Sequence, residues 1–254
     1  MSVNPAIQVF QVHKPRRILP ILNNRNLASL NNCTQLPFRQ AQVCDRTRPT
    51  YEPNVWRDPQ DYAEAIKCGY RRDYWQGQPY HVELWSEKDT VLGSIQELTD
   101  AFGITVRVGR GFTSETRVWE IANIISKTGK QNVVLFLGDH DPSGHDIERD
   151  WQSRLLRNGS GPFQLRRLAI NQVDIQKFQL PPQRVKASDT RSRGFVKKFG
   201  SQCVELDALP PAELRDRIRH AIESLQDKLA WDRAVEVEQV ELDCIVETVS
   251  KWGF

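Results

Sequence analysis

The sequence has no long hydrophobic run and no closely spaced cysteines. No apolar stretch in its 254 residues approaches the roughly 20 residues that a membrane-spanning helix needs. Its first residues lack the apolar core of a secretion signal, so we expect a cytoplasmic protein without membrane contact. The five cysteines are odd in number, scattered and free of C-x-x-C spacing, which argues against a disulfide framework and a zinc site.

The chain also has little net charge, at +3 overall, but this charge is unevenly distributed. Residues 1–79 hold 11 Lys and Arg against 6 Asp and Glu, which permits a nucleic-acid partner without requiring one. Residues 1–60 show little apolar periodicity and suggest a small helical appendage or a partly disordered arm. We therefore place a domain boundary near Pro79, with an appendage at 1–79 and the main domain at 80–254.

From residue 80 onward, short apolar runs alternate with amphipathic segments. The runs predict strands at 80–85, 104–108, 133–137 and 163–170, and the segments between them predict helices at 90–102, 114–128 and 144–157. Beyond them we expect a short strand at 203–206 and helices at 211–228 and 231–252. Alternation at this spacing predicts an α/β fold with a parallel sheet flanked by helices.

Acidic residues follow two of the predicted strands. Asp139 and Asp141 come directly after the run at 133–137, and Glu87 comes shortly after the run at 80–85. Pro142 and Gly144 provide a turn that would bring both aspartates to one cation. Since ligands of parallel sheets bind at the carboxyl ends of the strands, we expect one acidic edge there. Carboxylates without Cys or His ligands favour Mg²⁺.

These residues carry a resemblance to a known family. A glutamate after one strand and an Asp-x-Asp pair after another resemble the Toprim domain of topoisomerases, primases and certain nucleases. Gly138-Asp139-His140-Asp141-Pro142-Ser143-Gly144 is most similar to the topoisomerase VI A subunit and the related meiotic double-strand-break proteins, over about residues 80–228. The resemblance implies Mg²⁺-dependent DNA cleavage, with Glu87 catalytic and Asp139 and Asp141 binding the metal. It also implies a homodimer and an ATPase partner subunit as options.

One element of that family is missing from the sequence. Its nucleophile is a tyrosine in an upstream winged-helix domain, and no matching motif occurs before Glu87. Tyr74, in Arg72-Asp73-Tyr74, is too close to Glu87, so we interpret it as structural and residues 1–79 as an appendage or a shortened winged helix. Three functions remain open: a hydrolytic nuclease, a topoisomerase-like enzyme, and a non-catalytic DNA-binding or assembly module.

Several other polar residues are candidates with alternatives. Glu205 and Asp207 either extend the acidic edge or form a salt bridge, and His140 and His145 either tune the acidic pair or are exposed loop residues. Cationic side chains that could contact nucleic acid are Arg107, Arg110, Lys186, Arg191 and Arg193. A run of charge of this kind is also typical of a solvated helix face.

Overall fold

The computed structural model describes residues 55–109, 114–186 and 189–252. Among these residues, no helix is both long and apolar enough to cross a membrane. The helices are α1 (Pro59–Gly69), α2 (Leu92–Phe102), α3 (Glu115–Ser126), α4 (Pro142–Arg157), α5 (Gln172–Lys177), α6 (Ser192–Phe199), α7 (Pro211–Glu223) and α8 (Lys228–Ser250). The strands are β1 (Tyr80–Ser86), β2 (Thr105–Val108), β3 (Gln131–Leu137), β4 (Phe163–Ala169), β5 (Gln183–Arg184) and β6 (Gln202–Cys203).

The chain forms two compact units. The larger unit comprises Arg72–Val237 and contains all six strands. The smaller unit comprises Met1–Arg71 and Glu238–Phe254. Within the smaller unit, the Tyr70 hydroxyl donates a hydrogen bond to Glu241 at 2.6 Å, which ties the end of α1 to α8. The candidate site lies entirely in the larger unit.

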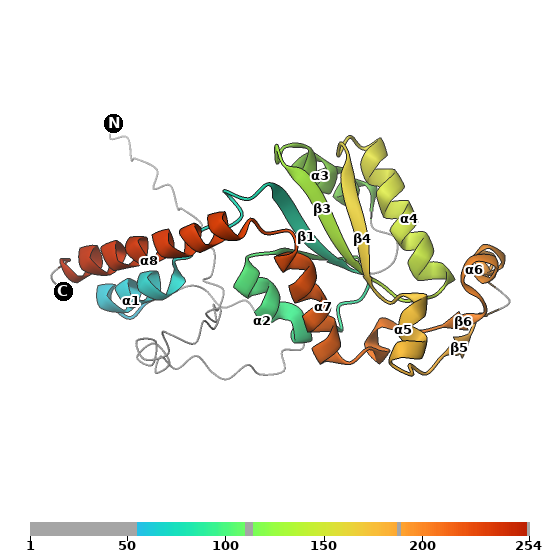
Figure 1. Ribbon diagram of the computed structural model, residues 1–254. Helices are drawn as coiled ribbons and strands as arrows, with labels where there is room; N and C mark the ends of the chain where they lie inside the picture. The colour runs from blue at the N-terminus through green and yellow to red at the C-terminus, as the bar shows by residue number, and fades with distance from the viewer. Residues whose placement is uncertain (1–54, 110–113, 187–188, 253–254) are drawn as a thin grey trace, which may run out of the picture. The chain divides into compact units, whose positions relative to one another are not determined.

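The larger unit is built on a four-stranded sheet in the order β2-β1-β3-β4, with every pair parallel (Figure 1). Helices cover both faces of the sheet, so the predicted α/β fold with a flanked parallel sheet is confirmed. The strands β1 and β3 are direct neighbours, and Ser86 pairs with Leu137 at their last position. The loops that follow these two strands therefore begin side by side.

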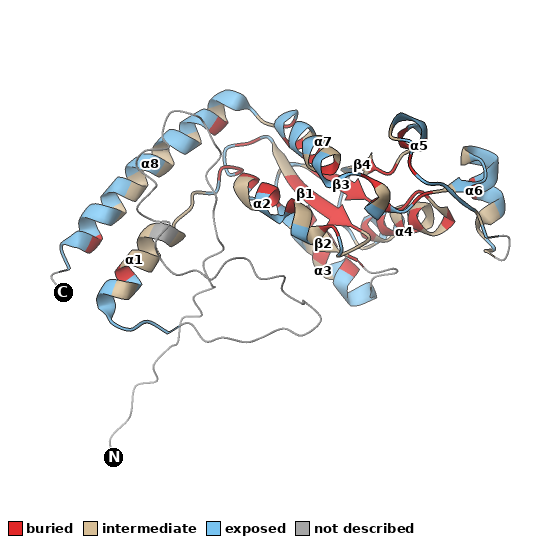
Figure 2. Cartoon of the chain, turned by 90° about the horizontal axis from the view of Figure 1, so that it is seen from below, coloured by how far each residue is buried: buried red, intermediate tan, exposed pale blue. Residues whose placement is uncertain are grey.

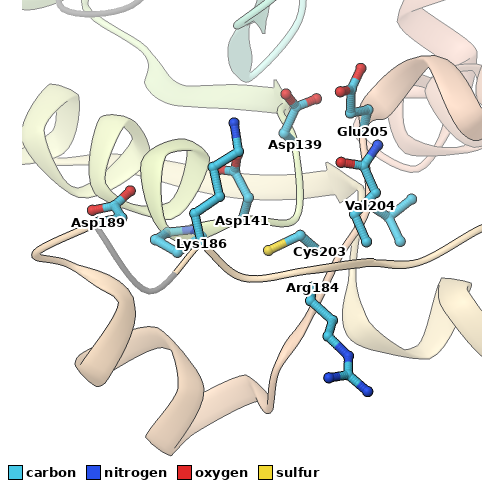
Figure 3. Close-up of a pocket in the computed structure, with 10 residues that line it drawn as sticks. Asp139, Asp141, Arg184, Lys186, Asp189, Cys203, Val204 and Glu205 are labelled. Atoms are coloured by element: carbon cyan, nitrogen blue, oxygen red, sulfur yellow. The ribbon is translucent and has the colours of Figure 1, made fainter.

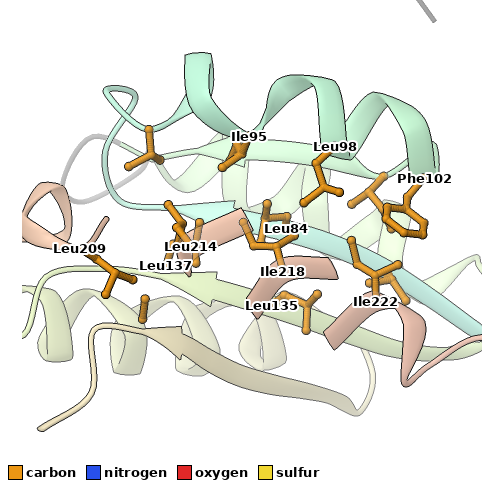
Figure 4. Close-up of a cluster of buried hydrophobic side chains, with 14 of the residues drawn as sticks. Leu84, Ile95, Leu98, Phe102, Leu135, Leu137, Leu209, Leu214, Ile218 and Ile222 are labelled. Carbon is orange, nitrogen blue, oxygen red and sulfur yellow. The ribbon is translucent and has the colours of Figure 1, made fainter. Parts of the chain in front are cut away.

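The sheet separates two hydrophobic clusters. One cluster packs α2 and α7 on one face, around Leu84, Ile95, Leu135 and Ile218, and Figure 4 shows these side chains meeting. The other packs α3 and α4 on the opposite face, around Trp85, Phe136 and Trp151. In Figure 2 the central strands are buried along most of their length. Burial on both faces explains why these strands read as continuous apolar runs and not as alternating ones.

Local sequence explains where the helices begin and end. Ser114 caps α3, because its hydroxyl accepts a hydrogen bond from the Arg117 amide. Gly103 ends α2 with φ of 63°, a left-handed conformation that glycine adopts without steric cost. Asp141 caps α4, which begins at Pro142, two residues before the predicted start at Gly144.

Some predicted boundaries were wrong. The periodicity at 211–228 predicts one helix, but α7 ends at Glu223 and α8 begins at Lys228. The helix α1 ends at Gly69, and Tyr74 lies buried in the larger unit with its ring 4.9 Å from that of Trp231. The strand expected at 203–206 is replaced by β6 and a 3-10 turn, Leu206–Ala208.

Candidate functional site

Two loops at the carboxyl ends of β1 and β3 bring Glu87 and Asp139 together. The Glu87 amide donates a hydrogen bond to the Leu137 carbonyl at 2.9 Å, which continues the pairing of the two strands by one residue. The Asp139 amide in turn donates to Glu87 Oε2 at 3.1 Å. Direct pairing of β1 with β3 therefore places a carboxylate from each loop at the same edge of the sheet.

Two glycines leave the space that the Glu87 side chain occupies. A Cβ atom at Gly144 would lie 2.9 Å from Glu87 Oε2 and 2.5 Å from the Asp139 carbonyl oxygen. A Cβ atom at Gly138 would lie 3.1 Å from the same Glu87 oxygen. Larger residues at either position would push the carboxylate or the backbone away. The closest neighbours of such a Cβ atom are the Phe136 ring at Gly138 and the Asp139 backbone at Gly144, and Glu87 lies next to both positions.

The two aspartates hold the loop in different ways. Asp139 Oδ1 accepts a hydrogen bond from the Leu206 amide at 2.7 Å, while its Oδ2 lies 3.2 Å from Lys88 Nζ. Asp141 Oδ1 accepts from the Gly144 amide at 2.6 Å as the cap of α4. The positive end of that helix stabilises a negative charge at this position. Both carboxylates therefore have structural partners as well as a candidate functional role.

Burial and like charge perturb this site electrostatically. Burial and, after it, the charge of Asp139 raise the pKa of Glu87 to about 7, against the opposing effect of the hydrogen bond from the Asp139 amide. Burial also raises the pKa of Asp139, although the Leu206 amide and Lys88 act against it. When two neighbouring carboxylates both have raised pKa values, a bound cation stabilises their ionised forms. Perturbed acids at a strand end are typical of functional sites.

Arg167, on β4, holds the loop that follows β3 through hydrogen bonds to its backbone. This role was not identified from the sequence. Its guanidinium donates to the backbone carbonyls of Gly138, Asp139 and Ile170 through Nη1 and of Gly144 through Nη2. Its Nε donates to Glu148 at 2.6 Å, and the side chain is 8% exposed. The available signal was a charged residue inside a predicted strand, which needs a partner when buried.

Lys88 was also missed, although it follows Glu87 directly. Its ammonium contacts Asp139 and also lies 3.1 Å from Glu205 and 3.2 Å from Asp207. Glu205 and Asp207 thus form the salt bridge that the sequence left open as one of two alternatives. The Thr90 hydroxyl further donates to Asp207 at 2.6 Å.

The interpretation of His140 as an exposed loop residue is wrong. His140 is fully buried, because its backbone pairs with Val204 in an isolated antiparallel bridge. Its Nδ1 lies 3.2 Å from Nε2 of His145, which stacks on Phe199 with ring centroids 4.3 Å apart. Burial and, after it, the charge of Arg167 lower the pKa of His145 to about 3. The two rings join the acidic loop to α6 as neutral groups.

The donor set fits a hard divalent cation, but not as a preformed cage. Within the described ranges, no three His, Cys, Asp or Glu side chains already converge as a metal-binding group. Three observations favour the fit: the donors are carboxylates, Glu87 is held back from ionisation, and Asp139 already contacts the cationic Lys88. Binding of Mg²⁺ would therefore require the side chains to reorient.

A pocket of about 240 Å³ opens beside Asp139 and Asp141 (Figure 3). Lys186 and Cys203 line it, and Arg184, also a lining residue, is directed away from the carboxylates in Figure 3. Burial raises the pKa of Cys203 to about 11, so its thiol stays protonated at neutral pH and is a poor nucleophile. The pocket therefore combines acidic and basic walls.

The predicted cationic contacts fall in different places. Lys186 is exposed in the pocket wall, and Arg193 is exposed on α6. The Arg191 guanidinium pairs with Asp189 and lies 3.5 Å from the Ser143 hydroxyl, near the start of α4. Lys186 and Arg191 are thus on the side of the acidic edge.

Arg107 is instead engaged inside the fold. Its Nε and Nη2 donate to the two carboxylate oxygens of Glu83 at 2.6 and 2.7 Å, and its side chain is 12% exposed. Arg110 lies outside the described residues. Glu83, inside β1, is therefore one partner of a buried ion pair.

These observations define a carboxylate cluster at the carboxyl edge of a parallel sheet, flanked by a mixed-charge pocket. Comparisons of the chain with models of protein families, with curated proteins and with solved structures found no match. The function is therefore inferred from the geometry of the site and from the resemblance of its motifs.

Proposed function

We propose that this protein is a Mg²⁺-dependent enzyme that cleaves phosphodiester bonds in DNA, with a catalytic domain of the Toprim type. The observation that carries the proposal is the contact of Glu87 with Asp139 at the ends of β1 and β3, where burial and like charge raise the pKa of Glu87 to about 7. Such a cluster gains stability when a cation arrives. The resemblance of residues 138–144 to the Toprim motif supports the same function.

Each carboxylate has a distinct role in this proposal. Asp139 and Asp141 would hold the metal, with Glu87 as a further ligand or as the proton-transfer group. When bound, Mg²⁺ supplies positive charge that neutralises the phosphate during cleavage. A carboxyl group with a pKa near neutrality exchanges protons efficiently at physiological pH, which suits Glu87 to general acid or base catalysis. Arg167 keeps the loop in place while these groups act.

Water is the nucleophile that this site favours. Tyr74, the tyrosine closest to the family's motif, is 7% exposed in the hydrophobic core of the larger unit, whereas a covalent DNA link requires an accessible hydroxyl. Hydrolysis needs no side-chain nucleophile. We therefore favour a nuclease over a topoisomerase-like enzyme, and Lys186 and Arg191 as phosphate contacts at the rim of the pocket.

The test is cleavage of supercoiled plasmid by the purified protein with Mg²⁺ or Mn²⁺. Asp139→Asn retains an oxygen for the Leu206 amide, so it should preserve the fold while lowering the cleavage rate at least about 100-fold. Lys228→Met, a change on the exposed start of α8, is the control and should cleave normally. Cleavage that persists without divalent metal, or in Asp139→Asn, would contradict the proposal. Protein trapped covalently on DNA would point to a tyrosine nucleophile.

A second function is favoured by a specific observation. Asp139 is already neutralised by Lys88, as expected for a Toprim fold that serves as a DNA-binding or assembly module. In that case, DNA binding would be independent of metal and would survive Asp139→Asn. It would fall when Arg191 and Arg193 are changed to glutamate. Adding a candidate ATPase subunit to an inactive preparation separates a binding module from an enzyme that lacks its partner.

A further inference from the structure

The ammonium group of Lys88 lies among three carboxylates from two separate segments. It is 3.2 Å from Asp139 Oδ2, 3.1 Å from Glu205 Oε2 and 3.2 Å from Asp207 Oδ2. Its side chain is 22% exposed. Burial alone would lower the pKa of Lys88, but the hydrogen bond to Glu205 and the charge of Asp139 raise it above the ordinary value, so the group stays charged.

The partners of Lys88 differ in their surroundings. Asp139 is a candidate metal ligand and is 11% exposed, whereas Glu205 and Asp207 are 60% and 43% exposed at the surface. The segment with these two residues is fixed to the site, since the Leu206 amide donates to Asp139 Oδ1. If the contact between Lys88 and Asp139 breaks, the Lys88 ammonium therefore still has Glu205 and Asp207 as partners.

We propose that Lys88 occupies the cation position beside Asp139 and yields it to the divalent metal, so that metal binding at this site is an exchange of cations. This inference rests on the proposed function and adds its regulation. Lys88 and the metal compete for the same carboxylate oxygen, while Glu205 and Asp207 retain the displaced ammonium. The exchange lowers the affinity for free metal, and it leaves the acidic edge neutralised whenever metal is absent.

The experiment measures Mn²⁺ affinity by titration calorimetry for four proteins: the wild type, Lys88→Met, Lys88→Arg and Lys228→Met. Lys88→Met removes the competing charge and should bind Mn²⁺ about tenfold more tightly, a change equivalent to about 1.4 kcal/mol. Lys88→Arg keeps the charge and should stay close to wild type. Lys228→Met removes the same charge at a site where the lysine is 86% exposed, and it should also stay close to wild type.

A measurement on the wild-type protein covers the case in which Lys88→Met does not fold. The side-chain Nζ resonance of Lys88, assigned by its loss in Lys88→Arg, should shift during titration with Mg²⁺, with the same dissociation constant as the metal itself. A resonance that does not respond while metal binds would overturn the exchange.

The outcomes separate this inference from the proposed function. If the wild type binds Mn²⁺ and Lys88→Met binds it no more tightly, the exchange is wrong and the metal site stands. If Lys88→Met alone binds Mn²⁺, Lys88 blocks the site and the exchange is supported in its strongest form. If neither protein binds Mn²⁺, both the exchange and the metal-dependent function are overturned.

Discussion

Glu83 and Glu87 lie four residues apart, one inside β1 and one just after it, and their surroundings are opposite. Glu83 is 2% exposed and accepts hydrogen bonds from Arg107, His81 and the Trp85 indole. Burial alone would raise its pKa, but the hydrogen bonds from Arg107 and His81 lower it to about 2. Glu87 faces Asp139 and has a pKa of about 7.

The difference shows that burial does not by itself make a carboxylate functional. Both glutamates are withdrawn from water, and the neighbouring charge decides the outcome. Glu83 has its cation built into the fold, so it is a structural residue. Glu87 faces another carboxylate, so a cation from outside would favour its ionised form. The predictions below test this contrast, from the largest expected change in stability to the smallest.

The largest effect is expected for Arg107→Met, which leaves an ionised carboxylate buried without its partner. At pH 7 we expect a loss of about 3–5 kcal/mol in the free energy of unfolding, measured by urea denaturation. The double variant Arg107→Met/Glu83→Gln should recover much of this loss, because the unpaired charge of the Glu83 carboxylate is removed. A loss below about 1 kcal/mol in the single variant would show that the pair is not what stabilises Glu83.

Arg167→Met should have the next largest effect. The change removes hydrogen bonds to the carbonyls of Gly138, Asp139, Gly144 and Ile170 and leaves Glu148 without its buried partner. We expect a loss of about 2–4 kcal/mol in the free energy of unfolding. Arg166→Met, at the neighbouring position of β4, is the matched control and should change stability by less than about 1 kcal/mol. Equal effects of the two variants would contradict the bracing role.

The sequence allowed prediction of the sheet and of the position of its acidic edge. The apolar runs before Glu87 and Asp139 are local signals, and the parallel direction of the strands follows from the alternation of strands and helices, whereas the direct pairing of β1 with β3 is known only from the structure. Gly103 and Ser114 set helix ends through their own backbone and side chain, so helix ends of this kind depend on local sequence.

What the sequence could not show is which distant groups complete the site. Lys88 meets Glu205 more than a hundred residues away, and Arg167 reaches the loop from β4. Neither pairing leaves a periodic pattern, because each depends on how a loop or strand is placed in three dimensions. The burial of His140 is similar, since it results from a single bridge to Val204. Long-range polar contacts therefore require the fold before they can be assigned.

The contrast between the two glutamates also predicts opposite pH dependence. Glu83 has a lowered pKa, so its contribution to stability is present above its ordinary value and is lost as the pH falls toward 2. Glu87 has a raised pKa, so the folded state loses stability as the pH rises from the ordinary value of 4.5 toward 7. Glu87→Gln should therefore stabilise the protein by about 1–2 kcal/mol at pH 8 and have little effect at pH 4.5.

Thermal unfolding at both pH values, with EDTA and with Mg²⁺, measures this effect. With Mg²⁺ the advantage of Glu87→Gln at pH 8 should disappear, because the metal neutralises the ionised wild-type site. A variant that is equally or less stable than wild type at pH 8 in EDTA would show that Glu87 is already compensated within the fold.

The smallest change in stability is expected for Asp141→Asn. Asparagine caps a helix about as well as aspartate, so the contact with the Gly144 amide should persist and the free energy of unfolding should change by less than about 0.5 kcal/mol. Asp141→Ala removes the cap and should cost about 1 kcal/mol. Both variants remove the charge, so both should weaken Mn²⁺ binding if Asp141 is a ligand. Loss of metal binding in the alanine variant alone would assign Asp141 to the cap and leave Glu87 and Asp139 as the ligands.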